Sequence, residues 1–259
     1  MPLDTSTYSL ALLRLDGRRW NELRRLTAQM RTQAAADGSS YLEMGNTKVI
    51  CTVSGPSEGR SGGGGGVGGG QRDKASIEVG ISVAGFSGVD RKKSAGGRGD
   101  KRLTEMSLTI SSAFSHTLFT HLYPHSTITL SLHILSQDGS LLAALLNAST
   151  LALIDAGIPM RDYICACTAG STSSYSSNDE KADPLLDLNG MEEQELPFLT
   201  VATVGETDDV VVLVAESRVQ VGRLEGMLAV GVDGCKQVRE ILDGVVRERG
   251  ARILEGSKI

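Results

Sequence analysis

The stretch that decides the fold is Asp138-Gly-Ser-Leu-Leu-Ala-Ala-Leu-Leu-Asn-Ala-Ser-Thr-Leu-Ala-Leu-Ile-Asp-Ala-Gly-Ile-Pro-Met160. Between Leu141 and Ala156 it is apolar almost all round, which is typical of a helix buried on most of its sides. Gly157 and Pro159 then close the helix. The stretch therefore predicts a helix in the interior of the domain.

Segments on both sides of this helix show the two regular periodicities. Residues 41–53, 75–86, 127–135, 163–169 and 198–214 predict strands, the first and last as hairpins that turn at Gly45-Asn46 and at 205–209. Gly55-Pro56 is expected to end the first hairpin. Residues 100–124 and about 221–247 carry apolar residues every three or four positions and predict amphipathic helices. The pattern favours a layered α+β or α/β domain but does not choose the topology.

The composition is that of a globular chain of 259 residues, with 40% apolar residues and a net charge of −5. This acidic balance argues against a surface that coats nucleic acid uniformly, but it allows a local basic site. We expect no secretory signal, and no apolar run approaches the ~20 residues that cross a bilayer. Four cysteines are too few for a disulfide framework and favour a reducing intracellular setting. Cys165 and Cys167 are expected in the core, and no metal site or cofactor is predicted.

A glycine-rich segment interrupts the predicted strands. From Gly62 to Gly70 every residue except Val67 is glycine, and such a run can neither pack nor keep a fixed backbone without a large entropy cost. A phosphate-binding loop would need Gly-Lys-Ser/Thr leading into a helix, whereas Gln71-Arg72-Asp73 follows here. We therefore expect a single domain over residues 1–259 with a flexible insertion at about 57–74.

Two stretches taken together resemble a known family. Asp138 to Leu142 and Leu186-Asp-Leu-Asn-Gly-Met-Glu-Glu193 resemble the two active-site segments of the RNase PH family of phosphorolytic 3′→5′ exoribonucleases. Similar segments at 16–18, 37–48 and 156–160 extend the resemblance over roughly residues 14 to 245. Within the family the chain is most similar to a ring subunit of the eukaryotic RNA exosome core, the counterpart of the catalytic subunit of the archaeal ring. The resemblance implies a two-layer α+β RNase PH fold (ribosomal protein S5 domain 2-like), with mixed sheets packed against helices.

The phosphate site of the family is altered in this chain. Active members carry Asp-Gly-Gly-Thr-Arg, a glycine turn at a helix start whose Arg points at inorganic phosphate. Here Asp138 and Gly139 match, Ser140 replaces glycine, and Leu141 and Leu142 replace Thr and Arg. An apolar pair cannot ligate an anion, and a helix N-terminus alone attracts one only weakly. The resemblance therefore implies a degenerate phosphate site, with Asp138 serving as a turn or N-cap residue.

The family also places two aspartates six residues apart, at the end of a strand and in the loop beyond. In phosphorolysis, such carboxylates protonate the departing oxygen or hold a divalent ion. Asp187 matches the first position, and Glu193, one methylene longer, stands at the second. We expect both to be relics and no residue to be catalytic, because a displacement near 1 Å can cost ~100-fold in rate. Without the resemblance, residues 179–195 would be interpreted as a solvated acidic loop.

Basic residues gather before and at the start of the predicted helix at 100–124. They are Arg91, Lys92, Lys93, Arg98, Lys101 and Arg102. A charge run is usually a solvated face, but this one is strongly of one sign inside an acidic protein. The family holds RNA phosphates with an Arg-Arg pair, whose position Lys101-Arg102 matches. We expect contacts with the RNA backbone and little base stacking, since no aromatic residue is interleaved.

The resemblance implies a non-catalytic structural and RNA-channel subunit that supports 3′→5′ RNA processing and degradation by associated nucleases, including rRNA maturation and mRNA turnover. The expected partners are other RNase PH-like ring subunits, S1/KH cap subunits, an associated hydrolytic exoribonuclease and single-stranded RNA, but no membrane. The expected locations are the nucleus, including the nucleolus, and the cytoplasm. Two alternatives stay open: an active phosphate-dependent 3′→5′ exoribonuclease that uses Asp187 and Glu193, and an unrelated small-molecule enzyme of α/β type.

Overall fold

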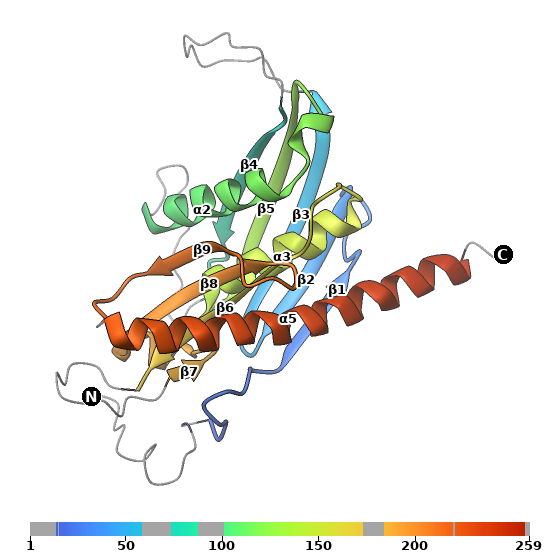
Figure 1. Cartoon of the computed structure of the whole chain (residues 1–259). Coiled ribbons are helices and arrows are strands. Elements are labelled where there is room, and N and C mark those ends of the chain that lie inside the picture. The colour runs from blue at the N-terminus through green and yellow to red at the C-terminus, as the bar shows by residue number, and fades with distance from the viewer. Residues whose placement is uncertain are drawn as a thin grey trace, which may run out of the picture.

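Two β-sheets enclose the apolar helix α3 (Leu141–Asp155) in the computed structural model of the chain (Figure 1). The structure describes residues 14, 16–58, 74–87, 101–172, 184–219 and 221–256. The first sheet, in the order β1-β2-β3-β5-β4, contains β1 (Leu26–Met30), β2 (Gly38–Met44), β3 (Thr47–Glu58), β4 (Ser76–Val83) and β5 (Ser126–Ser136). The second, in the order β7-β6-β8-β9, contains β6 (Ile164–Ser171), β7 (Pro184–Leu186), β8 (Phe198–Val204) and β9 (Val210–Ala215). The remaining elements are α2 (Lys101–Thr117), the 3-10 helix η1 (Thr120–Leu122), α4 (Gly190–Glu195) and α5 (Val221–Gly256).

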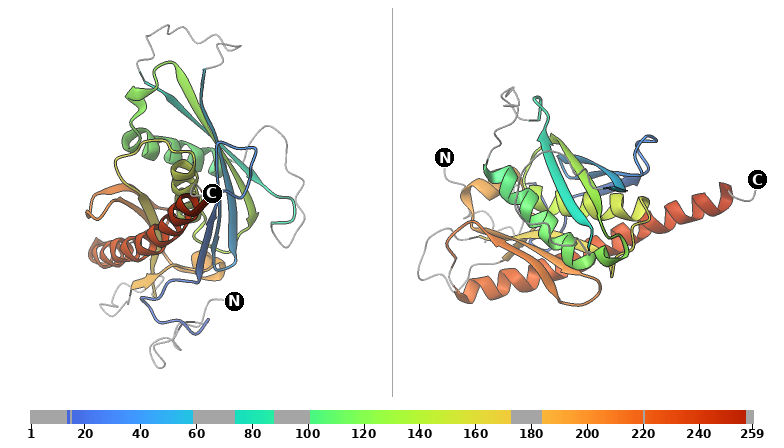
Figure 2. Two further views of the ribbon diagram at one scale, coloured as in Figure 1. Left: turned by 90° about the vertical axis from the view of Figure 1, so that its right-hand side faces the viewer. Right: turned by 90° about the horizontal axis from the view of Figure 1, so that it is seen from above.

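The strand pairings confirm an α+β architecture. Neighbouring strands are antiparallel in both sheets except for β4 and β5, which run parallel and make the first sheet mixed. A parallel pair needs a crossover, and α2 supplies it between β4 and β5. Seen from above, the layers follow in the order first sheet, α2 with α3, second sheet, α5 (Figure 2).

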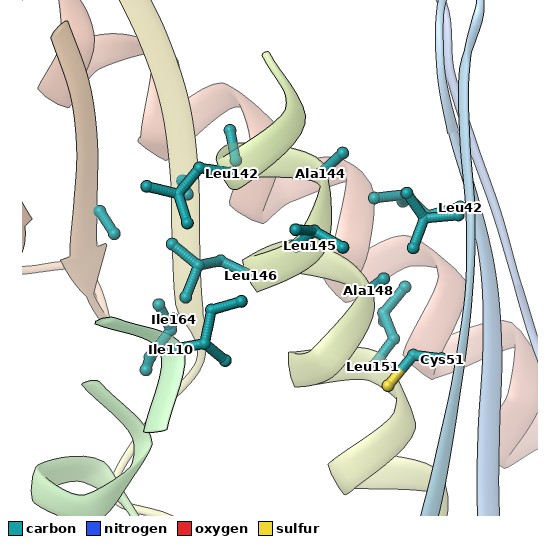
Figure 3. Packing of buried hydrophobic residues seen from close by; sticks show 14 of the residues in the cluster. Leu42, Cys51, Ile110, Leu142, Ala144, Leu145, Leu146, Ala148, Leu151 and Ile164 are labelled. Carbon is teal, nitrogen blue, oxygen red and sulfur yellow. The ribbon is translucent and has the colours of Figure 1, made fainter. Parts of the chain in front are cut away.

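Helix α3 forms the centre of the core because apolar side chains surround it on all sides. Every residue from Leu141 to Leu153 is buried. Leu42 and Cys51 of the first sheet lie on one side of α3, and Ile164 of β6 lies on the other (Figure 3). The buried Asn147 is satisfied by β6, since its side chain donates to the carbonyl of Ala166 and accepts from its amide. The helix thus joins the two sheets.

Helix α5 covers the face of the second sheet opposite α3. Two of its glycines allow close approach: a Cβ at Gly234 would lie 2.4 Å from the Leu186 side chain, and one at Gly231 would lie 3.0 Å from Val201. Strand β6 is consequently buried along its whole length, with α3 on one face and α5 on the other. This double burial explains why residues 163–169 carry an apolar run rather than an alternating pattern.

Most of the elements predicted from periodicity are confirmed, including both hairpins and the buried positions of Cys165 and Cys167. The prediction that Gly55-Pro56 ends the first hairpin is wrong, because β3 continues to Glu58. The register against β5 shifts between Ser54 and Ser57, so the proline, which lacks an N–H, sits in an irregularity of the ladder. No helix in the described ranges is long and apolar enough to cross a membrane. Most of the predicted insertion, residues 59–73, lies outside the described residues.

We predict that Gly38→Ala lowers the free energy of unfolding by about 2 kcal/mol or more. The added methyl carbon would lie 2.3 Å from the carbonyl oxygen of Ala152 and 2.5 Å from the amide of Ala156, and these backbone atoms of α3 cannot move aside. Urea unfolding measures the loss. Gly244→Ala on α5 is the matched control, since a Cβ there meets nothing within 4 Å and alanine favours a helix by up to about 1 kcal/mol. Equal losses in both variants would contradict the close packing at Gly38.

Candidate functional site

The turn before α3 contains two consecutive residues with positive φ, Gly139 at 74° and Ser140 at 51°. A side chain at Gly139 is excluded, because a Cβ there would lie 2.6 Å from backbone atoms of Leu188 and Asn189. At Ser140 the left-handed backbone costs a non-glycine residue about 1–2 kcal/mol. Its hydroxyl lies 2.9 Å from Oδ1 of Asp187 and 3.0 Å from the Leu188 carbonyl, and these contacts offset the cost.

Asp187 lies buried on the opposite side of this turn, with both carboxylate oxygens occupied. Oδ1 accepts from the guanidinium of Arg24 at 2.8 Å and faces the Ser140 hydroxyl, while Oδ2 accepts from the Arg24 amide at 2.8 Å. Burial by itself would raise the pKa of Asp187, but the charge and hydrogen bonds of Arg24 hold that pKa below its usual value. The group is therefore an ionised structural carboxylate at neutral pH, and a general acid would need the opposite shift.

A second buried ion pair secures the same segment. Arg14 pairs with Glu192 of α4 and donates to the main-chain carbonyls of Leu186 and Asp187. Arg18 donates to the Asp187 carbonyl as well. These contacts overturn the interpretation of 179–195 as a solvated loop for the described residues 184–195, which form β7, α4 and the buried connection between them.

Glu193 reaches the same turn from α4. Its Oε1 accepts from the backbone N–H of Ser140, and burial raises the pKa of Glu193 despite the lowering effects of the Ser140 amide, Arg24 and Arg102. The two carboxylates singled out from the sequence are thus brought together around one residue, with Asp187 at the Ser140 hydroxyl and Glu193 at the Ser140 amide. Each carboxylate thus accepts from a different polar group of Ser140.

Leu141 and Leu142 form the first turn of α3 and belong to the hydrophobic core. Their side chains are only 5% and 7% exposed. Figure 3 shows Leu142 at the start of the helix among the other buried apolar side chains. The two positions that the resemblance relates to phosphate binding are therefore filled with packed hydrocarbon, which offers an anion no ligand.

Asp138 connects three parts of the chain. Its Oδ1 accepts from the Gly190 amide at 3.0 Å, its Oδ2 accepts from the Asn46 side chain at 2.9 Å, and its carbonyl accepts from Arg24. The N-cap of α3 is Ser140, without a side-chain capping bond, so the N-cap interpretation of Asp138 is wrong. The residue instead fixes the turn against the start of α4.

A pocket of about 310 Å³ opens beside this turn. Its lining residues are Ser87, Arg102, Gln137, Gly139, Gly190, Glu193, Gln194, Phe198 and Glu216. Arg102 lies 3.4 Å from Glu216 in a half-exposed ion pair. One basic residue predicted for RNA contact therefore lines the same pocket as Glu193. Lys101 is exposed. Arg91, Lys92, Lys93 and Arg98 lie outside the described residues.

Residues capable of holding a metal do not assemble in the described ranges. No group of three or more His, Cys, Asp or Glu side chains there is arranged around a common point. The sequence alone did not predict the arginines that organise the site, Arg14 and Arg24. Their partners lie 178 and 163 residues away, a separation that no local pattern can indicate. A possible signal was the density of arginine between residues 14 and 25, in a segment with no strong helical or strand period.

Similarity to known proteins identifies the class of protein to which this fold and site belong. The pattern of the 3′ exoribonuclease family, domain 1 (RNase PH), matches residues 22–159. The chain therefore belongs to the RNase PH family of 3′ exoribonucleases.

Two relatives are similar over nearly their full length. The exosome complex component SKI6 of Saccharomyces cerevisiae is 38% identical over 248 residues, which cover 95% of this chain and 94% of the relative. The exosome complex component RRP41 of Homo sapiens is 38% identical over 251 residues, covering 94% and 95%.

Solved structures share the fold. Rrp46 of rice (Oryza sativa) matches with a TM-score of 0.74 and 23% identity, over 90% of this chain and all of that one. A chain of the Archaeoglobus fulgidus exosome with RNA bound to the active site matches with a TM-score of 0.72 and 20% identity, over 90% and 94%.

We predict that Asp187→Asn lowers the free energy of unfolding by about 3 kcal/mol at pH 7, because it leaves the Arg24 guanidinium buried without a counter-charge. The pKa of Asp187 is depressed in the folded state, so its contribution is complete above its ordinary value of 3.8. It is lost as the pH falls through the lower folded-state pKa. The difference in the free energy of unfolding between the wild type and the variant should thus be constant above about pH 5 and become smaller below it.

Urea unfolding at pH 7, 5 and 3 checks this dependence. Asp243→Asn serves as the control, since the Asp243–Arg247 pair is a surface i,i+4 pair that contributes no more than about 0.5 kcal/mol. An Asp187→Asn variant as stable as the wild type at pH 7 would show that the buried pair stabilises nothing.

Proposed function

We propose that this chain is a structural and RNA-guiding ring subunit of an RNA exosome core, and that it does not catalyse phosphorolysis. The two relatives above are named as exosome complex components and match nearly the whole chain, which supports the assignment to such a ring. In this role the subunit supports 3′→5′ RNA processing and degradation, including rRNA maturation and mRNA turnover, carried out by associated nucleases.

The single observation that carries the non-catalytic part is the burial of Leu141 and Leu142 at the start of α3. Phosphorolysis needs inorganic phosphate beside the terminal phosphodiester, held by cationic side chains and N–H groups. The leucines supply no cation, and the nearby Arg24 is committed to Asp187 in a buried pair. Asp187 in turn is buried, and both of its carboxylate oxygens accept hydrogen bonds from Arg24.

The proposed partners follow from this role. They are the other RNase PH-like subunits of the ring, a cap of S1/KH subunits, an associated hydrolytic exoribonuclease and single-stranded RNA. The proposed locations are the nucleus with its nucleolus and the cytoplasm. For RNA we propose backbone contacts by Lys101 and Arg102, together with Arg91, Lys92, Lys93 and Arg98 in the segment before α2.

A second candidate, an active phosphorolytic exoribonuclease, is favoured by the position of one arginine. Arg102 lines the same pocket as Glu193, so a guanidinium is available near the altered phosphate site. It is paired with Glu216 there, and its side chain would have to exchange that partner for phosphate.

A phosphorolysis assay distinguishes the two functions. The chain, co-purified with its RNase PH-like ring partner, is given single-stranded RNA with a free 3′ end, inorganic phosphate and Mg²⁺, and nucleoside diphosphates are measured. We expect RNA binding without diphosphate release, both in the wild type and in Leu142→Arg. Arginine at position 142 should also lower stability by about 2–3 kcal/mol, since a nearly buried side chain becomes charged.

Diphosphate release that disappears in Asp187→Ala would overturn the non-catalytic proposal. An Asp187→Ala variant that keeps the release would assign the activity to a different subunit or to a contaminant. Release by Leu142→Arg alone would mean that the rest of the catalytic site has survived intact.

We predict that Lys101→Glu combined with Arg102→Glu weakens RNA binding by the assembled ring without dissociating it. Each lost contact removes an electrostatic attraction between a basic side chain and an RNA phosphate, which salt weakens. The dependence of RNA affinity on salt concentration should therefore also become shallower. Titration of fluorescent single-stranded RNA at several salt concentrations measures both effects. Lys236→Glu with Arg247→Glu on α5 is the charge-matched control. If the control weakens RNA equally, the effect is one of net charge and the proposed contact is wrong.

A further inference from the structure

We propose that Glu193 is a built-in anion, which occupies the place at the start of α3 where an external anion such as phosphate would bind. This inference rests on the proposed loss of phosphorolysis and assigns it a second, independent cause. The leucines at 141 and 142 supply no cationic ligand, and the carboxylate of Glu193 occupies the N–H group of Ser140 at the start of the helix.

The first step of the argument is the state of the helix N-terminus. The first amides of a helix have no partner within the helix and carry partial positive charge. In most helices a side chain at the N-cap accepts from one of them, but the N-cap Ser140 makes no such bond, since its hydroxyl is directed to Asp187 and Leu188. The carboxylate of Glu193 takes the Ser140 amide instead.

The second step is that Glu193 is delivered by a rigid element. Helix α4 begins with a capping box, in which Asn189 accepts from the Glu192 amide and the Glu192 side chain accepts from the Asn189 amide. Arg14 fixes Glu192 through a buried ion pair, and Asp138 accepts from the Gly190 amide. The Glu193 carboxylate is therefore positioned by α4 from one side and by the turn itself from the other.

The third step is electrostatic. A phosphate that approached the Ser140 amide would meet the carboxylate within hydrogen-bonding distance, in a site where burial strengthens the repulsion between like charges. The longer side chain of glutamate is what allows the contact from α4, and an aspartate at this position would end one methylene short. A cation restored at position 142 therefore cannot recover phosphate binding while Glu193 remains.

Phosphate binding by the complex with the ring partner tests this proposal. The probe is inorganic phosphate, titrated calorimetrically at constant ionic strength against wild type, Glu193→Ala, Leu142→Arg and the double variant. We expect no detectable phosphate binding in the wild type or in Leu142→Arg. In Glu193→Ala we expect measurable binding, with an affinity for phosphate at least about tenfold above the detection limit that applies to the wild type. Leu142→Arg should add affinity only in the Glu193→Ala background. Glu193→Gln keeps the size of the side chain and removes its charge, so its affinity for phosphate should also rise. This variant shows that the rise does not come from a structural change in α4.

Glu195→Ala is the matched control, since it removes one carboxylate from the same helix. An equal gain in this control would reduce the effect to net charge and overturn the proposal, as would a Glu193→Ala variant with no gain. Phosphate binding by the wild type would also overturn it. Failure of the proposed function has a different signature, the release of nucleoside diphosphates by the wild type, so the two outcomes can be told apart.

Discussion

The buried ion pair between Arg24 and Asp187 is the interaction on which the arrangement of this site depends. Arg24 precedes the first strand and Asp187 follows β7, so the pair ties the N-terminal segment to the second sheet. The same guanidinium donates to the Asp138 carbonyl, and the same carboxylate faces the Ser140 hydroxyl. A buried charge without its partner is strongly unfavourable, so neither residue can leave this geometry alone. The turn before α3 and the start of α4 are held in place as a result.

The fold could be predicted from the sequence where burial imposes a period. The alternating residues of β4 and β5, the amphipathic face of α2 and the apolar run of α3 all have one or two faces in the core, and each was recognisable. Short elements gave no such signal: β7 spans 3 residues and α4 spans 6. Strand β1 has a half-buried pattern and few β-branched residues, so only its pairing with β2 creates it.

The site was predictable in its residues but not in its connections. The resemblance pointed to Asp187, Glu193 and the altered stretch 138–142, and the structure brings these together at Ser140. What the sequence could not show is the partner of each group. The arginines that neutralise Asp187 and Glu192 come from the far end of the chain. The hydroxyl of Ser140 has hydrogen-bond partners that appear only when the loop at 187–190 is in place.

The packing of the first turn of α3 also makes the proposed loss of phosphorolysis difficult to reverse. Leu141 and Leu142 now contribute to the packing that joins the two sheets, so replacing them with polar residues costs stability before it can restore any activity. If the proposed loss of phosphorolysis is right, the stability of the core therefore opposes a return of the activity at these two positions. Every residue that packs closely against these leucines would add to the stability that such a reversal costs.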